Sequence, residues 1–234
     1  MTTVTTVICG VPNEIDQFST SSEMVFYFDW NDIRRPMPTL LHTADVHLAA
    51  DHPERIEALE SILERADNED VDLLTIGGDF FDSEIDADEL RADLRDRFAG
   101  LPFEVLTIPG NHDAEAFGED LFFGEDFQAA VGEPFEHHHI GDDLRVTCLP
   151  YTPQPTEDLL VALAERVPFE GAEALLLHCS LEAPFADTTV GEETTQRYFP
   201  IGKATLAELG FDYYLSGHYH APHRVELPDG ATFV

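Results

Sequence analysis

Lysine is almost missing from this sequence. The chain has 234 residues and 12 basic side chains, of which only Lys203 is a lysine, against 47 acidic ones, so its formal net charge is −35. The acidic residues are spread along the whole chain together with 17 Phe, which is not the composition of a disordered acidic segment. It is typical of a folded protein with an acidic surface in the cytoplasm of a halophile, because at about 1 M salt the Debye length is only about 3 Å.

Cysteines and long apolar runs are also scarce. The three cysteines (Cys9, Cys148 and Cys179) are far apart and form no Cys-x-x-Cys pair, which disfavours a disulfide framework and a thiolate zinc site. No apolar run approaches the roughly 20 residues of a membrane span, and no secretory signal is visible at the N-terminus. We therefore expect a soluble, cytoplasmic protein with no membrane partner. The sequence also lacks a basic patch for nucleic acid, but molar salt would screen such a patch, so a DNA substrate is not excluded.

From residue 39 onwards, short apolar strands alternate with helices, which is typical of α/β architecture. Strands are expected within 39–45, 71–79, 103–113, 144–151, 173–180 and 213–220. Helices are expected within 52–66, where Pro53 stands near the start, and within 86–100, where Gly100 closes the helix. The segment 223–234 contains Asp229-Gly230, a hairpin signal.

Residues 1–36 show no clear periodicity. We predict that Met37 is the natural start and that the preceding residues are an extension, and the alternative is a genuine extra strand in "MVFYFDW" (24–30). Residues 37–234 then form one domain. Its last residues, "ATFV", read as a strand stopped midway, so we expect a chain truncated at its C-terminus.

Polar side chains follow the expected strands at the points where these end. They are Asp45 and His47, Asp79, the run Asn111, His112 and Asp113, then His178, and last His218 and His220. In α/β folds, ligands bind beyond the carboxyl ends of the strands. Alone, each motif is weak, since Asn and Asp also favour turns. The ordered series, with each member on its own strand end, indicates one shared site.

This series offers two carboxylates, one amide oxygen and four imidazoles when His112 is set aside. Oxygen and imidazole ligands without thiolate suit manganese, iron or zinc rather than calcium. Seven ligands are too many for one tetrahedral ion but suit two ions about 3.5–4 Å apart, bridged by a carboxylate. The run 137–139 is interpreted as a solvated loop or edge strand, and His42, His52 and His223 as ordinary histidines.

The ordered series Asp-x-His, Gly-Asp, Gly-Asn-His-Asp, His and Gly-His-x-His, within residues 39–220, resembles that of the calcineurin-like metallophosphoesterases. Within this superfamily, "GGDFFD", "IPGNHD", "RYFPI" and "FDYYLSGHYHAPHRVEL" are similar to the SbcD-type exonucleases of DNA double-strand-break repair. The resemblance implies an α/β sandwich of two mixed β-sheets flanked by helices, with a metal site at the strand C-terminal ends. It also implies two divalent ions, Mn²⁺ first and Fe²⁺ or Zn²⁺ as alternatives.

The resemblance assigns a role to each site residue. It implies that Asp45, His47 and His220 hold the first ion, that Asp79 bridges, and that Asn111, His178 and His218 hold the second. It places His112 beside the phosphate, where it stabilises the transition state or protonates the leaving oxygen, oriented by Asp113. Some nucleases of this branch carry a histidine three residues after the bridging aspartate, and this chain has Asp82 there.

The function implied is a metal-dependent phosphodiesterase, most simply a DNA repair exo- or endonuclease that acts with an SbcC-type SMC ATPase. The alternative is a stand-alone phosphodiesterase or phosphatase for a nucleotide or another small phosphoester. A non-catalytic scaffold is disfavoured, because such a protein is expected to lose ligands and this sequence keeps all of them. The sequence is compatible with a homodimer but does not define the oligomeric state.

Overall fold

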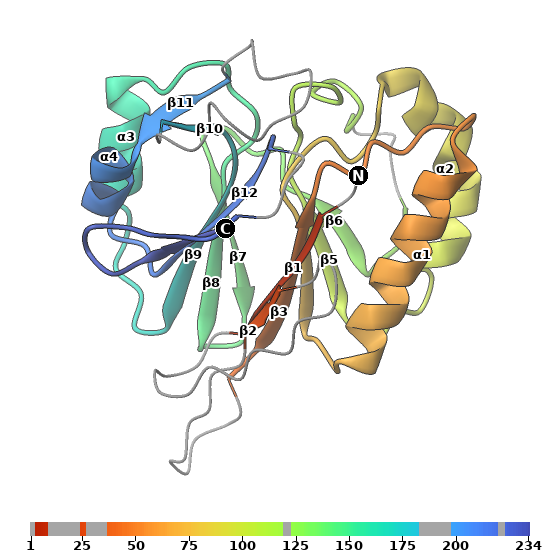
Figure 1. The fold of residues 1–234 in the computed structure, drawn as a ribbon, viewed down its shortest axis with the longest axis horizontal. Coiled ribbons are helices and arrows are strands. Elements are labelled where there is room, and N and C mark those ends of the chain that lie inside the picture. The colour runs from red at the N-terminus through yellow and green to blue at the C-terminus, as the bar shows by residue number, and fades with distance from the viewer. Residues whose placement is uncertain (1–2, 9–23, 27–36, 119–122, 183–197, 220–222) are drawn as a thin grey trace.

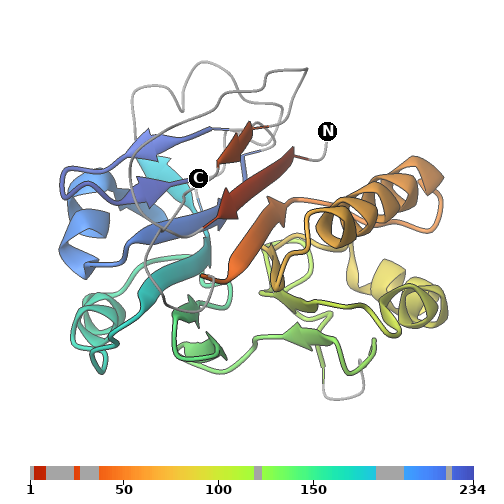
Figure 2. The ribbon, with the colours of Figure 1, turned by 90° about the horizontal axis from the view of Figure 1, so that it is seen from below.

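The structure is a computed structural model that describes residues 3–8, 24–26, 37–118, 123–182, 198–219 and 223–234, the first two ranges as backbone only. Helices cover the outside of two β-sheets. They are α1 (Pro53–Asn68), α2 (Glu84–Phe98), α3 (Glu157–Ala164) and α4 (Lys203–Leu209). Figure 1 shows α1 and α2 on one side, α3 and α4 on the other, and the strands between them; Figure 2 shows the same layers from below.

The first sheet has six strands in the order β2-β1-β3-β4-β5-β6. They are β1 (Thr3–Ile8), β2 (Met24–Phe26), β3 (Thr39–Ala44), β4 (Leu73–Ile76), β5 (Glu104–Thr107) and β6 (Phe127–Ala129). The strands from β3 to β6 run parallel, while β1 pairs antiparallel with β3 and parallel with β2. The carboxyl ends of β3, β4 and β5 therefore lie at one edge of the sheet.

The second sheet also has six strands, in the order β13-β14-β12-β9-β8-β7. They are β7 (Glu136–Ile140), β8 (Leu144–Cys148), β9 (Ala172–His178), β12 (Tyr213–Gly217), β13 (Val225–Glu226) and β14 (Thr232–Phe233). Two short strands, β10 (Ser180–Glu182) and β11 (Pro200–Gly202), pair separately. Both large sheets contain parallel and antiparallel pairs. The predicted fold class, a sandwich of two mixed sheets flanked by helices, is confirmed.

Three apolar cores join these layers. Leu40 of β3 and Leu176 of β9 belong to the core between the two sheets. Leu59 of α1 packs in the core beneath the first pair of helices, and Leu206 of α4 in the core beneath the second pair. All four side chains are at most 1% exposed, and burying each contributes about 1.5–3 kcal/mol. The sheets are thus packed on both faces and form a rigid base for the loops at their ends.

The elements predicted from the sequence are present, with additions. The extra strand considered in "MVFYFDW" is β2, and β1 is a further strand that periodicity did not indicate. The start at Met37 remains a prediction. The histidine run 137–139 lies on β7, the edge strand of the second sheet, as the interpretation allowed. The hairpin signal joins β13 to β14. The helices α3 and α4 were not predicted.

His42 is a structural histidine with partners at both ring nitrogens, as the sequence interpretation allowed, and it ties the two sheets together. This residue of β3 is 3% exposed, and its Nε2 lies 3.1 Å from the carbonyl oxygen of Ser216 on β12. Its Nδ1 lies 3.0 Å from the Thr75 hydroxyl on the neighbouring strand. Burial lowers the pKa of His42 from 6.5 to about 4, so the imidazole is neutral in the folded protein at pH 7.

This buried imidazole makes stability depend on pH. Since the pKa of His42 is lower in the folded chain, the unfolded chain binds its proton first, and stability falls as the pH drops from 6.5 towards 4. Between pH 7 and pH 4.5 we expect His42 alone to remove about 2.5 kcal/mol. Chemical unfolding of the metal-free protein and of His42→Gln in the same molar KCl measures this, because the other titrating groups cancel in the difference. Equal losses in both proteins would rule out this role.

Candidate metal centre

The loops that follow β3 and β4 continue side by side after the strands end. The backbone N–H of Asp45 donates to the oxygen of Gly78 at 3.1 Å, and that of His47 donates to the oxygen of Asp79 at 3.0 Å. The first two polar strand ends are therefore held in register by backbone hydrogen bonds. Their side chains reach the same place because the strands are adjacent and parallel.

Four candidate ligands have positive φ angles, which are uncommon for residues other than glycine. The angles are 54° at Asp45, 49° at His47, 50° at Asp79 and 95° at His218. Such backbone strain persists only where the surroundings fix it, and it concentrates at functional sites. In this chain the strained residues are ones that the sequence analysis had chosen as candidate ligands, on the chemistry of their side chains alone.

Asp79 lies at the centre of the cluster and is fully buried. Its Oδ1 accepts the backbone N–H of His112 at 2.9 Å. Its Oδ2 makes no well-aligned hydrogen bond within the described ranges, but lies 3.3 Å from His178 Nε2 and 3.9 Å from His47 Nε2. Burial raises the pKa of Asp79, but the attraction of His178 and His47 and the hydrogen bond from the N–H of His112 together hold that pKa well below its usual range.

His178 joins the second sheet to this cluster. Its Nδ1 lies 2.8 Å from the carbonyl oxygen of Gly77, and its Nε2 lies 3.0 Å from Oδ1 of Asn111. Burial lowers the pKa of His178, but the attraction of Asp79 and Asp45 and the hydrogen bond to the oxygen of Gly77 together raise that pKa to about 9. Oxygen atoms of Asp79 and Asn111 thus converge on one imidazole nitrogen, as expected for ligands of one ion.

Asp45 and His218 connect the two sheets at the same level. Both carboxylate oxygens of Asp45 accept the backbone N–H of His218, at 2.9 and 3.0 Å. The imidazole of His218 is 4% exposed, and its ring centroid lies 5.4 Å from that of His178. The backbone of one candidate ligand is therefore anchored by the side chain of another. His220, the remaining predicted ligand, lies outside the described residues.

Two glycines are required for this close approach. A Cβ atom at Gly110 would lie 2.1 Å from Oδ1 of Asp79, so no larger residue fits there. Gly78 has a φ of 92°, and a Cβ atom on it would lie 2.5 Å from Nδ1 of His178. The glycines next to the polar residues in the sequence thus serve the packing of the site as well as its turns.

Asp113 holds the backbone of two loops of the site. The carboxylate is fully buried, and it accepts backbone N–H groups of Phe80 at 2.8 Å, Phe81 at 3.1 Å and Gly110 at 2.7 Å. Asp113 thus ties together the loops after β4 and β5. That it also orients the ring of His112 stays a prediction. Burial is the main reason that its pKa is raised to about 6.

The residues that meet here fit a divalent ion. Ligand atoms of Asp45, His47 and Asp79 all lie within 4.8 Å of one another, and the three side chains are buried. A buried carboxylate is costly unless it is paired, yet Asp79 has no arginine or lysine partner among the described residues. In the metal-free chain the imidazole of His178 pairs with this carboxylate, and a cation at Oδ2 of Asp79 would take over that role. Asn111 and His178 could hold a second ion on the other side of the same carboxylate.

A family profile for calcineurin-like phosphoesterases matches residues 38–222. The chain therefore belongs to the calcineurin-like phosphoesterase family, whose members are metal-dependent hydrolases of phosphoesters with dinuclear sites for divalent ions. No helix in the described ranges is both long and apolar enough to cross a membrane.

Two solved structures are similar to this chain. Phosphopantetheinyl hydrolase (PptH) from Mycobacterium tuberculosis is 17% identical with a TM-score of 0.48, over 84% of this chain and 88% of that one. Nuclease MPE from Pseudomonas putida is 22% identical with a TM-score of 0.34, over 62% of this chain and 64% of that one. A search of curated proteins gave no match.

Sequence reasoning missed the residues that surround the ligands. Asp82, noted only as a departure from a motif, lies 3.2 Å from Nδ1 of His47. Arg55 on α1 contacts both the carbonyl oxygen of His47 and Asp82. Tyr198 packs edge-on against His218, with 5.4 Å between ring centroids. The position of Asp82, three residues after Asp79, was the one available signal.

Proposed function

We propose that this chain hydrolyses phosphodiester bonds of DNA at a dinuclear centre, with Mn²⁺ as the metal. The observation that carries the hydrolytic part is the convergence of carboxylate, amide and imidazole ligand atoms from both sheets around Asp79. We assign Asp45, His47 and His220 to one ion, Asn111, His178 and His218 to the other, and Asp79 to both. The donor set, oxygen and imidazole without thiolate, suits manganese, with Fe²⁺ and Zn²⁺ as alternatives.

When bound, two such ions stabilise charge on phosphoryl oxygens and lower the pKa of water. The chain positions the remaining groups. The backbone N–H of His112 is fixed on Asp79, so the imidazole stands directly beside the candidate ligands. Its ring meets that of His47 edge-on, with 4.8 Å between centroids. We assign His112 to the leaving oxygen of the phosphoester, which it would protonate as the bond breaks.

The choice of DNA rests on the likeness of the strand-end motifs to those of the SbcD-type exonucleases. From the same likeness we propose an SbcC-type SMC ATPase as partner, which would place both proteins in the cytoplasm. Few cations are available for the phosphate backbone, since the chain has 12 basic residues in all. Binding of DNA would then depend on metal–phosphate contacts, which suits a halophilic protein because molar salt weakens lysine and arginine contacts.

A nuclease assay tests this proposal. The pure protein in molar KCl is incubated with Mn²⁺ and end-labelled linear duplex DNA, and in parallel with a small chromogenic phosphodiester. We expect both substrates to be cleaved only when the metal is present. Turnover of the small diester with intact DNA would instead support a phosphodiesterase for small phosphoesters, and no turnover of either would contradict the proposal.

Replacing His112 with alanine removes the proposed general acid and leaves all the proposed metal ligands in place. We expect kcat for the small diester to fall about 10²–10⁴-fold, while Mn²⁺ affinity and thermal unfolding stay close to those of the unchanged protein. The fall in kcat should be smaller for a diester with a more acidic leaving group, because that group needs less protonation as it departs. Equal loss for both diesters, or full activity in the variant, would remove His112 from this role.

A further inference from the structure

The run of three histidines on β7, which the proposed function does not use, lies at the edge of the second sheet. Val146, the partner of His138 on β8, is buried in the core between the two sheets. His138 therefore faces the first sheet, where its Nε2 lies 2.9 Å from Oε2 of Glu104. Because successive residues of a strand point to opposite faces, His137 and His139 both lie on the outer face of the second sheet.

This pair of histidines is exposed, and the two rings lie next to each other. Their planes are inclined by 20°, with 6.4 Å between the centroids. Nδ1 of His137 lies 3.0 Å from Oγ1 of Thr147, which can accept its proton, so Nε2 at the outer end of the ring remains for an ion. The ring of His139 stacks on that of Phe169, with 5.6 Å between centroids. Neighbouring side chains thus hold both rings, which lowers the cost of ordering them around a ligand.

The surroundings of the pair favour a neutral imidazole at His137. Partial burial is the largest cause that lowers the pKa of His137, and the charge of Arg145 is the second. The neutral ring is the form that binds metal ions. Arg145 itself is 4% exposed and donates to the carboxylate of Glu173, which reduces the repulsion that its guanidinium would exert on a cation.

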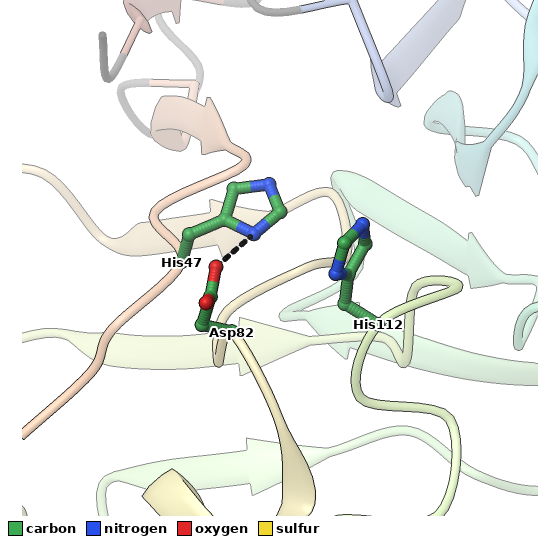
Figure 3. Close-up of side chains that lie close together, drawn as sticks. All are labelled: His47, Asp82 and His112. Carbon is green, nitrogen blue, oxygen red and sulfur yellow. Dashed lines mark ion pairs between the residues drawn. The ribbon is translucent and has the colours of Figure 1, made fainter. Parts of the chain in front are cut away.

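The pair is separate from the candidate metal centre. β8 lies between β7 and β9, the strand that ends at His178. Ligand atoms of His47, Asp82 and His112 also lie within 4.8 Å of one another, but this group, drawn in Figure 3, contains a candidate ligand and belongs to the metal centre. The two histidines on the outer face of β7 share no residue with it.

We propose that His137 and His139 bind one divalent transition-metal ion, with Cu²⁺ preferred, at a site on the outer face of β7 that takes no part in hydrolysis. Imidazole ligands suit copper, nickel and zinc, and affinity for a given set of nitrogen ligands rises from Mn²⁺ to Cu²⁺ and falls again at Zn²⁺. Mn²⁺, which suits carboxylate and water ligands, is expected to stay at the metal centre. The remaining coordination positions of the ion on β7 are filled by water.

Histidine-ring NMR spectra of the unchanged protein, titrated with Cu²⁺ at pH 7.5 in molar KCl, test this site. The paramagnetic ion should broaden the ring signals of His137 and His139 at the same Cu²⁺ concentration. In His139→Gln, broadening of His137 should need about 10²-fold more Cu²⁺, because the second imidazole binds the same ion intramolecularly. His138→Gln is the matched control, since this ring faces the first sheet, and should leave the required concentration unchanged.

Three results would overturn the inference. They are no broadening of the two rings in excess Cu²⁺, broadening of the two rings at different concentrations, and equal broadening of His137 in His139→Gln and the unchanged protein. Hydrolysis of the small phosphodiester with Mn²⁺ should be the same in His137→Gln as in the unchanged protein, and a loss would contradict a separate site. If the unchanged protein hydrolyses no phosphodiester, the proposed function fails, and the Cu²⁺ spectra still decide the inference.

Discussion

Replacing Asp79 with asparagine is expected to abolish hydrolysis, with a loss of at least about 10²–10³-fold in kcat. One oxygen of this carboxylate is held by the N–H of His112, and the other faces His47 and His178. Asparagine has a similar shape but carries no charge, so it cannot pair with two cations. Steady-state kinetics on a small phosphodiester and Mn²⁺ titration should therefore show that activity and tight binding of both ions are lost together.

Two controls make this result specific. Asp88→Asn removes the same charge from an exposed position on α2 and should leave activity and metal binding unchanged. Circular dichroism should show that Asp79→Asn keeps the fold, because the sheets are packed on both faces away from this residue. Full activity in a folded Asp79→Asn protein would show that the bridging role is wrong.

The largest expected effect on stability comes from Glu173, at the far end of β9 from the metal centre. Its carboxylate accepts hydrogen bonds from Arg145 and from Arg166, and these side chains are 13%, 4% and 6% exposed. Arg166 also donates to the carbonyl oxygens of Leu163 and Leu209, at the ends of α3 and α4. Glu173→Gln would leave two buried guanidinium groups without a counter-charge, so we expect a loss of about 3–5 kcal/mol.

Urea unfolding in molar KCl measures this loss, with Glu170→Gln as the control on an exposed neighbour that carries the same charge. Salt should not mask the effect, since buried pairs are screened much less than exposed ones. The hydrolytic rate of the folded Glu173→Gln fraction at low temperature should match that of the unchanged chain. A stability change below about 1 kcal/mol would show that the network is dispensable.

The sequence was informative where one residue type at a strand end decides the structure. Apolar runs predicted β3, β4, β5, β9 and β12, and the polar residues after them lie together because neighbouring strands are parallel. The family was also recognisable, because its motifs keep their order along the chain. The helix α1 was predicted within 52–66, and its residues Leu59 and Ile62 are buried.

The sequence was uninformative where a contact joins distant segments. His178 meets the oxygen of Gly77 across 101 positions of the chain, and His42 meets Ser216 across 174. No local period encodes such pairs. The backbone contacts of Asp113 were not predicted for the same reason, since the N–H groups of Phe80 and Phe81 that it binds lie on another loop. The helix α4 was not predicted because it is short. The sequence did offer one signal for its end, Gly210, which has a φ of 70° in the structure.

The number of Mn²⁺ ions that each chain binds tests the central proposal most directly. Metal-free protein in molar KCl is titrated with Mn²⁺, and electron paramagnetic resonance separates free ions, isolated bound ions and magnetically coupled pairs. We predict two bound ions per chain with a coupled spectrum, which is lost in Asp79→Asn. A single uncoupled ion, or binding that is the same in Asp79→Asn, would contradict a dinuclear centre bridged by this carboxylate.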